Sequence, residues 1–329
     1  MGFLSKYRPE KNIEQIELTP WFYYDIYRTK KRIIHIPSPE LKRVQRLIMR
    51  KYFKPHWTPL SVKDAASVHC GKKWLMKLDI KDFFNSITEE QIKEIISRYV
   101  SLYESPIQIR RTDESDTEQI FSMCTINGKL PTGAPTSPYI ANLLLSEFDI
   151  HIEGYCRTCD VYYSRYMDDL FFSTNGPQYL LSLVELEVLR QFKEFGFSVN
   201  VDKIKYISSN KLQKVLGLGV NNQHPVLTKG DKRKYRAYFY NMLSPLQFNK
   251  QKIYKDHELE VLGHLAYIKS VDEEYYLRVK FYIFNLLVKF NLQKKSCLKN
   301  LMKIIGNGYE LGCVLSHTQP NSNTPNGQT

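Results

Sequence analysis

Residues Val161–Phe172 (VYYSRYMDDLFF) place two adjacent carboxylates, Asp168 and Asp169, between apolar, β-favouring stretches. This pattern predicts a β-hairpin with both acids at its tip. Mg²⁺ prefers hard oxygen ligands and usually takes one or two carboxylates together with substrate phosphates. The hairpin is therefore a candidate metal site, although paired aspartates also occur in solvated turns.

A third carboxylate follows a separate strand. Trp74–Ile80 (WLMKLDI) has the alternation of a strand that presents Asp79 at its end. In two-metal sites, ions about 3.5–4 Å apart clamp the attacking and leaving oxygens of a phosphoryl displacement. Three carboxylates held close together would repel one another without metals. We therefore expect Asp79, Asp168 and Asp169 to converge on metal ions.

Six blocks, in the same order along the chain, resemble those of reverse transcriptases. The blocks are Lys31–Gln45, Asp79 with Phe83 and Phe84, Leu130–Pro138 (LPTGAPTSP), Tyr166–Asp169 (YMDD), Gly196–Lys203 (GFSVNVDK) and Val215–Gly219 (VLGLG). Within this family the chain most resembles bacterial retron-type enzymes and their defence-associated relatives, which are related to group II intron enzymes. It departs from the retron pattern at Ala65, where asparagine is typical, and at Leu216, where threonine is typical.

The resemblance implies an α+β fold, a right-hand polymerase with fingers, a ferredoxin-like palm and a helical thumb. Its parts would be the fingers (1–73 and 88–129), the catalytic palm (74–87 and 130–228), a basic thumb (229–314) and a disordered tail (315–329). The predicted order of strand, helix, helix, hairpin, helix and strand across residues 74–207 agrees with such a palm.

The resemblance also implies roles for individual residues. The three aspartates, with the backbone carbonyl of Ile80, would hold two Mg²⁺ ions. Lys203 would take part in catalysis by donating a proton to the leaving pyrophosphate, and Phe84 would exclude ribonucleotides by blocking a 2′-hydroxyl. A structural role for Lys203 and a core role for Phe84 stay open. The other nucleotide-binding residues would be Gly133, Ala134, Pro135 and Arg32, with Lys31 as the alternative to Arg32.

The chain is basic, with a formal net charge of +13. Residues 28–63 contain eleven Lys or Arg residues and one acid, and residues 229–303 contain sixteen against seven acids. Two basic flanks around an acidic centre suit a protein that grips phosphate backbones on both sides of a metal site. Charge runs are also typical of solvated faces. The candidate RNA- and DNA-binding residues are Lys42, Arg43, Lys232, Arg233, Lys234 and Arg236.

The sequence favours a cytoplasmic protein without a membrane partner. It contains no run of about 18 apolar residues, and its first residues lack the apolar core of a secretory signal. Cys156 and Cys159 form a lone pair without a second pair at zinc spacing, so we expect reduced thiols.

Together with these observations, the resemblance implies an RNA-directed DNA polymerase in anti-phage defence. It would use dNTPs to copy part of a cognate structured non-coding RNA, which serves as template and primer, and would leave an RNA–DNA hybrid. By resemblance, its protein partners would be an effector and a host RNase H. Two alternatives stay open: a non-retron defence enzyme that makes repeat or untemplated DNA, and an RNA-binding scaffold that restrains a toxic effector.

Local sequence patterns predict further features. Residues 1–20 and the acid-rich segment 104–120 lack apolar periodicity, so we expect weak packing in the first and a surface loop in the second. Ser38 and Pro39 predict the start of a helix. His69 is expected to be a structural histidine rather than an RNA contact. The helix predicted to start at Ser38 and Pro39 would bury Leu41, Val44, Leu47 and Ile48.

Overall fold

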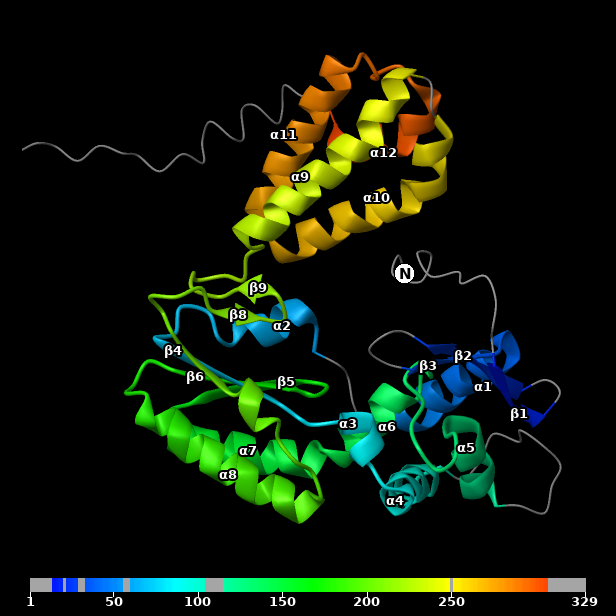
Figure 1. Ribbon diagram of the computed structural model, residues 1–329, viewed down its shortest axis with the longest axis vertical. Helices are drawn as coiled ribbons and strands as arrows, with labels where there is room; N and C mark the ends of the chain where they lie inside the picture. Colours follow the sequence, from blue (N-terminus) through cyan, green and yellow to red (C-terminus); the bar gives the residue numbers. More distant parts are fainter. Residues whose placement is uncertain are drawn as a thin grey trace, which may run out of the picture. The chain divides into compact units, whose positions relative to one another are not determined.

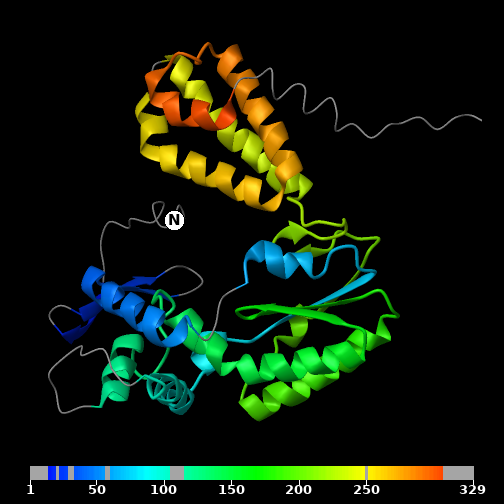
Figure 2. The ribbon, with the colours of Figure 1, turned by 180° about the vertical axis from the view of Figure 1, so that it is seen from behind.

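The computed structural model describes residues 14–19, 22–28, 33–55, 60–103, 115–248 and 251–306. These residues form two compact units, one from Glu14 to Val215 and one from Leu216 to Gly306. The expected palm–thumb boundary at residue 228 therefore lies inside the second unit. Figure 1 and Figure 2 show the elements of both units from opposite sides.

The centre of the first unit is an antiparallel four-stranded sheet with the strand order β5-β6-β4-β7. Its strands are β4 (Trp74–Asp79), β5 (Tyr162–Tyr166), β6 (Asp169–Thr174) and β7 (Lys205–Ser208). Successive strand residues point to opposite faces. Met76 and Leu78 of β4 therefore share a face with their partners Phe172 and Leu170 of β6, and all four belong to the buried core. Asp79 consequently points to the other face.

Helices cover both faces of this sheet. α7 (Ser146–Thr158) and α8 (Tyr179–Phe195) lie along the core face, and α2 (Val62–Ser67) lies over the opposite face (Figure 1). The rings of Phe148 in α7 and Phe192 in α8 stack with their centroids 4.4 Å apart. α8 ends at Gly196, whose φ of 77° is a left-handed conformation that glycine adopts without steric cost.

His69 follows α2 and is fully buried against the sheet. Its ring nitrogens lie 2.7 Å from the hydroxyl of Ser173 and 2.8 Å from that of Ser164, one on each strand of the β5–β6 hairpin. Burial lowers the pKa of His69 to about 3, so the ring is neutral at physiological pH. The expected structural role of His69 is therefore confirmed.

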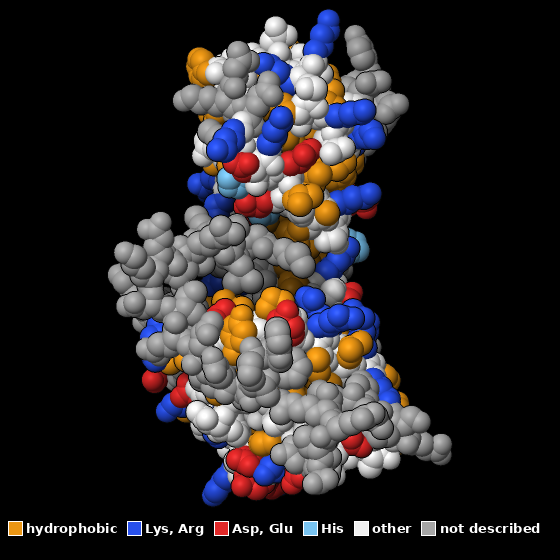
Figure 3. Space-filling view, turned by 90° about the vertical axis from the view of Figure 1, so that its right-hand side faces the viewer, with side chains coloured by type: hydrophobic (Ala, Val, Ile, Leu, Met, Phe, Trp, Pro, Cys, Tyr) orange, Lys and Arg blue, Asp and Glu red, His pale blue; other side chains and the backbone are white. Residues whose placement is uncertain are grey.

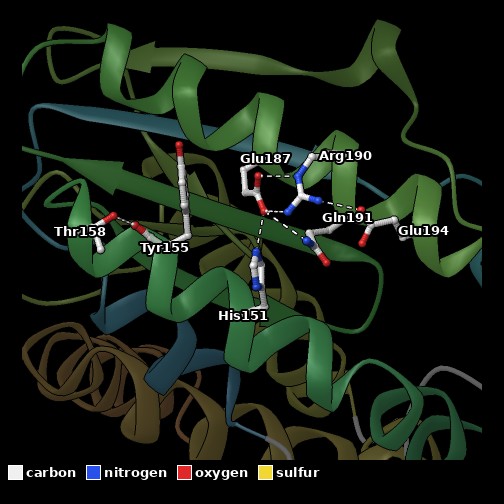
Figure 4. A network of polar contacts seen from close by, with 7 residues as sticks. All are labelled: His151, Tyr155, Thr158, Glu187, Arg190, Gln191 and Glu194. Atoms are coloured by element: carbon white, nitrogen blue, oxygen red, sulfur yellow. Dashed lines mark hydrogen bonds and ion pairs between the residues drawn. The ribbon is translucent and has the colours of Figure 1, made fainter.

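A network of polar side chains joins α7 to α8 (Figure 4). Glu187 of α8 accepts hydrogen bonds from Arg190 in the same helix at 2.7 and 2.9 Å, and from His151 of α7 at 2.5 Å. The bonds from Arg190, followed by the bond from His151, lower the pKa of Glu187 to about 2. The two helices are therefore held together by polar contacts at the surface and by the phenylalanine stack inside.

The rest of the first unit contains a three-stranded antiparallel sheet and several helices. The strands of this sheet are β1 (Glu14–Thr19), β2 (Phe22–Arg28) and β3 (Ile33–Pro37), so residues 14–19 form a strand where weak packing was expected. The accompanying helices are α1 (Pro39–Ile48), continued by a π-helical turn (Met49–Phe53), α3 (Phe83–Ser86), α4 (Glu89–Val100), α5 (Asp116–Cys124) and α6 (Ser137–Leu144). α5 begins inside the segment 104–120 that was expected to be a loop.

Helix α1 starts as predicted and buries Leu41 and Ile48 as expected, but Gln45 is buried in place of Leu47. The N–H of Leu41 donates to the Ser38 hydroxyl at 3.3 Å. Leu47, expected inside, is 45% exposed, whereas Gln45 is fully buried. The Gln45 amide donates to the hydroxyl of Tyr24 at 2.6 Å and to the carbonyl of Met123 at 2.7 Å. A polar bridge, rather than apolar packing alone, therefore ties α1 to β2 and α5.

The second unit consists mainly of helices. They are α9 (Lys229–Leu243), α10 (Gln251–Val271), α11 (Glu273–Lys289) and α12 (Lys299–Ile305), with 3₁₀ turns at Ser244–Phe248 and Ser296–Leu298. The short strand β8 (Lys214–Val215) ends the first unit, and β9 (Leu218–Gly219) lies near the start of the second. Within the described ranges, no helix is long and apolar enough to cross a membrane.

Candidate active site

β5 and β6 form the hairpin that the sequence predicts, and Tyr166 pairs with Asp169 across it. The two residues between them, Met167 and Asp168, form the tip. Met167 has a φ of 59°, a left-handed conformation that costs a non-glycine residue on the order of 1–3 kcal/mol. Positive φ at the first central position suits the twist of two-residue hairpins. The tip therefore presents both aspartates from an unusual backbone geometry that its surroundings must stabilise.

Strand pairing brings the third aspartate to this hairpin. Asp79, the last residue of β4, lies directly opposite Asp169 in the β4–β6 register. The N–H of the next residue, Ile80, donates to the carbonyl of Asp168 at 3.0 Å. The N–H of Asn200 donates to the carbonyl of Asp79, also at 3.0 Å. The structure thus brings the three predicted aspartates together and holds their backbone with hydrogen bonds.

Two lysines neutralise two of the three carboxylates. The Nζ atom of Lys203, in the 3₁₀ turn Val201–Lys203, lies 2.6 Å from Oδ2 of Asp79. The Nζ atom of Lys77 lies 2.7 Å from Oδ1 of Asp169. With the carboxylates paired in this way, no three acidic, His or Cys side chains in the described part of the chain form a ready cluster for a metal ion. Carboxylate oxygens are the hard ligands that a divalent cation such as Mg²⁺ takes, so the chemistry of the three side chains fits such an ion.

The third carboxylate, Asp168, is half-buried. Burial raises the pKa of Asp168, a hydrogen bond that its carboxylate accepts from its own backbone N–H lowers it, and the neighbouring carboxylates of Asp169 and Asp79 raise it further. The pKa of Asp168 is raised overall because its carboxylate is poorly solvated and lies close to two other carboxylates. A divalent cation among the three carboxylates would remove this cost, which again agrees with metal binding.

Phe84, at the start of α3, lies at the edge of the core. Its ring centroid is 5.5 Å from that of Phe83, and Phe83 lies 5.9 Å from Phe197. Phe83 and Phe197 are buried, whereas Phe84 is only half-buried. Of the two neighbouring phenylalanines, Phe83 therefore serves the core, and part of the Phe84 ring stays accessible.

The loop before α6 touches the backbone of β3. A Cβ atom on Gly133 would lie 1.9 Å from the carbonyl oxygen of His35, so only glycine allows this approach. The neighbouring Thr132 hydroxyl donates to the carbonyl of Ile33 at 3.1 Å. Ala134 is buried, and Pro135 is half-buried. The close approach that the structure shows for Gly133 is thus to β3.

The sequence model of a family described as reverse transcriptase (RNA-dependent DNA polymerase) matches residues 22–264. The chain belongs to the reverse transcriptase family. It is 29% identical over 259 residues to the retron Ec83 reverse transcriptase of Escherichia coli. The aligned region covers 70% of this chain and 79% of that relative. The retron Ec86 reverse transcriptase of E. coli is 27% identical over 295 residues, which cover 82% of this chain and 83% of the relative. The retron Ec73 reverse transcriptase of E. coli is 30% identical over 286 residues, which cover 78% of this chain and 84% of the relative. The reverse transcriptase is thus an RNA-directed DNA polymerase.

The remaining residues predicted to bind nucleotides or nucleic acid are either not described or belong to α1 and α9. Lys31 and Arg32 fall outside the described residues. On α1, Lys42 is half-buried and Arg43 is exposed. The remaining four, all on α9 of the second unit, are Lys232, Arg233, Lys234 and Arg236.

Lys77 belongs to the site, and sequence reasoning missed it. Besides its ion pair with Asp169, its Nζ atom lies 5.2 Å from the ring centroid of Phe171. The alternation of β4 carried the signal, because residues 77 and 79 of a strand lie on the same face. A lysine two residues before a predicted metal ligand is therefore expected beside that ligand.

Replacing Gly133 with alanine is expected to lower the melting temperature of the reverse transcriptase by a few degrees and to slow DNA synthesis about tenfold. The added Cβ would push the loop away from His35, and forcing extra atoms into packed regions typically costs about 1–3 kcal/mol. Thermal unfolding and primer extension with the purified enzyme measure the two effects.

Gly154→Ala in α7 is the matched control for this change. No atom lies within 4 Å of the Cβ that it adds, and alanine favours a helix over glycine by about 1 kcal/mol. The control should therefore keep full activity and stability. A Gly133→Ala enzyme that behaved like this control would refute the tight contact with His35.

Proposed function

We propose that this reverse transcriptase joins nucleotides by two-metal-ion catalysis and copies part of a cognate structured non-coding RNA into DNA. The observation that carries the proposal is the register of β4 and β6, which sets Asp79 opposite Asp169 and beside Asp168 at the tip. Carboxylates from separate strands can clamp two divalent ions around a phosphoryl transfer. The retron reverse transcriptases among its relatives support the choice of template.

The three aspartates, with the backbone carbonyl of Ile80, would hold two Mg²⁺ ions. Such ions lower the pKa of the primer hydroxyl and neutralise charge on the triphosphate and the leaving pyrophosphate. Lys203 and Lys77 would release the carboxylates with which they now pair. Lys203 would then be free to donate a proton to pyrophosphate.

The residues for the incoming nucleotide would surround these carboxylates. We assign the role of sugar gate to Phe84, because its partly accessible ring is supported from behind by the buried Phe83. Gly133, Ala134 and Pro135 would shape the surface beside the new base pair. Arg32, or alternatively Lys31, would bind the triphosphate, for which arginine offers a bidentate fork.

The parts of a right-hand polymerase can be assigned to individual elements of the two units. We assign the four-stranded sheet with α7 and α8 to a ferredoxin-like palm, because its strands and helices follow a β-α-β-β-α-β order with the hairpin in the middle. The three-stranded sheet with α1, α4 and α5 would be the fingers, and α9–α12 the thumb. Residues 315–329, the expected tail, lie outside the described residues.

A basic groove on the second unit suits a phosphate backbone. It has a volume of about 370 Å³ and lies between α9 and α11. Among the described residues, no ion pair joins Arg233 or Arg236 to an acid. Basic side chains predominate over acidic ones on the face of this unit that Figure 3 shows. The groove is lined by Lys229, Lys232, Arg233, Arg236, Tyr275, Arg278, Val279 and Tyr282.

We propose that this groove, with the neighbouring Lys234, binds the RNA or its hybrid with DNA. Five of its eight lining residues are cationic, and neutralising phosphates releases counterions, which supplies most sequence-independent affinity. On the fingers, Lys42 and Arg43 would contact the same nucleic acid.

The relatives favour a retron-like setting over the other defence roles. The product would be an RNA–DNA hybrid made in the cytoplasm, an effector protein would act with it against phage, and a host RNase H would remove template. In the scaffold alternative, by contrast, RNA binding and protection would survive the loss of catalysis.

Replacing Asp168 with asparagine is expected to slow primer extension on an RNA template at least about 1000-fold, because a lost metal ligand removes several kcal/mol of transition-state stabilisation. The fold and RNA binding should persist, because the atom of Asp168 that accepts the hydrogen bond from Ile80 belongs to the backbone. Asp256→Asn, the same change at an exposed position of α10, is the control and should remain active. Wild-type extension by Asp168→Asn would refute the metal assignment.

Replacing Phe84 with alanine is expected to raise the incorporation of ribonucleotides relative to deoxynucleotides roughly 10- to 100-fold, because a steric barrier against a single hydroxyl is removed. Single-nucleotide incorporation with matched rNTP and dNTP pairs gives the ratio. Phe248→Ala removes a ring that is 71% exposed in the second unit and should leave the ratio unchanged. An unaltered sugar preference in Phe84→Ala would dismiss the gate.

Replacing Arg233 and Arg236 together with alanine is expected to weaken RNA binding and to reduce the slope of log K against log salt by about 1.4–1.8, since each lost phosphate contact removes about 0.7–0.9. Binding titrations at several salt concentrations measure this slope. Arg190→Ala removes an exposed arginine that already pairs with Glu187 and Glu194, so its slope should match the wild type. An unchanged slope in the double variant would place the nucleic acid elsewhere.

A further inference from the structure

Arg165 is a buried arginine on β5, next to the residues of the hairpin tip. Its side chain is only 4% exposed. Its Nε and Nη2 atoms donate to the two carboxylate oxygens of Asp149 in α7, at 2.8 and 2.5 Å. Its Nη1 atom donates to the carbonyl of Met167 at 3.0 Å and to the side-chain oxygen of Asn142 in α6 at 2.5 Å. One guanidinium thus links two helices to the tip.

Asn142 adds a second link between α6 and the tip. It is almost completely buried, and its Nδ2 atom lies 3.1 Å from Sδ of Met167 and 2.6 Å from the carbonyl of Pro138. Its amide oxygen accepts the bond from Arg165, so both ends of the amide group are occupied. The backbone and the side chain of Met167 are therefore each contacted by one member of the same network.

The target of this network is the strained residue of the hairpin. Met167 has a φ of 59°, and such a conformation persists only where the surroundings over-determine it. Its carbonyl belongs to the peptide unit that leads into Asp168. The carbonyl of Asp168 in turn accepts from Ile80, and Asp169 pairs with Asp79. A shift of the Met167 peptide would therefore move two of the three aspartates relative to β4.

We propose that Arg165, Asp149 and Asn142 are positioning residues that set the geometry of Asp168 and Asp169 through the backbone of Met167. They form no part of the predicted metal-ligand set, and their action on the reaction is indirect. The proposal rests on the proposed catalytic role of the two aspartates. Substituting residues that hold metal ligands in place through hydrogen bonds commonly lowers metal affinity or activity by about 10- to 100-fold.

A purely structural ion pair explains the contacts less well. α7 is already joined to α8 by the stacked rings of Phe148 and Phe192 and by the bonds to Glu187. A buried ion pair is in itself weak evidence for stability, because desolvation offsets much of its attraction. The two bonds to Asp149 would be enough to hold α7 against β5. The Nη1 group of Arg165 instead donates to Met167 and Asn142, which an ion pair with α7 does not require.

The experiment compares Arg165→Lys, Arg165→Met and Asn142→Leu with the wild type. Asn142→Leu keeps the ion pair and removes only the amide link, so it remains informative if an Arg165 variant fails to fold. Hydrogen–deuterium exchange would measure the exchange rates of the backbone amides in the tip peptide 166–169 and of the amide of Ile80. Mn²⁺ binding, followed by electron paramagnetic resonance, and kcat and KM for dNTPs complete the set.

The expected result is faster exchange confined to the tip and Ile80 in folded variants, with Mn²⁺ affinity and kcat each lowered about 10- to 100-fold. The KM for dNTPs should change little, and Arg165→Lys should retain more activity than Arg165→Met because it keeps one charged donor. Arg190→Met, which removes an exposed arginine of α8, should leave every readout unchanged.

Normal exchange at the tip and normal Mn²⁺ affinity in folded variants would overturn the proposal. Faster exchange spread evenly over the sheet, with wild-type kcat per folded molecule, would do the same and would indicate a structural pair. If Asp168→Asn proved active, the catalytic assignment would fail, yet exchange at Ile80 would still show whether Arg165 sets the position of the tip.

Discussion

The antiparallel pairing of β4 with β6 is the constraint on which the rest of the site depends. Its register sets Asp79 opposite Asp169 and leaves the Ile80 N–H to bind the carbonyl of Asp168. Side chains alternate with a period of two, so a slip of one residue would move Asp79 to the face covered by α7 and α8. The burial of Met76 and its neighbours against those helices prevents this slip, and apolar packing thereby selects the position of the acids.

Electrostatic repulsion works against the same arrangement. Burial and two neighbouring carboxylates raise the pKa of Asp168, so bringing the acids together opposes folding unless positive charge is close. The chain supplies that charge itself, through Lys77 from β4 and Lys203 from the turn before β7. In the folded chain these two ion pairs offset part of the repulsion between the carboxylates. Because the lysine side chains are long and partly exposed, they can withdraw without disturbing the strands.

Much of this arrangement could be predicted from the sequence, because strand periodicity and helix caps are local signals. The hairpin around Asp168 and the strand ending at Asp79 lie where the alternation placed them. The buried Gln45 could not be predicted, since its partners come from β2 and α5 and are distant in the chain. α5 was hidden because its first turn belongs to the acid-rich segment and its apolar residues begin only at Ile120. The contact of Gly133 with His35 likewise depends on tertiary structure.

Apolar packing is non-directional, so it can select a face of the sheet but cannot fix the orientation of single peptide groups. That orientation comes here from three directed bonds: Arg165 to the carbonyl of Met167, Ile80 to the carbonyl of Asp168, and Asn200 to the carbonyl of Asp79. Each bond holds the backbone at or beside one of the aspartates, and each donor comes from a different segment of the chain. The geometry of the three aspartates thus relies on polar contacts that composition and periodicity do not reveal.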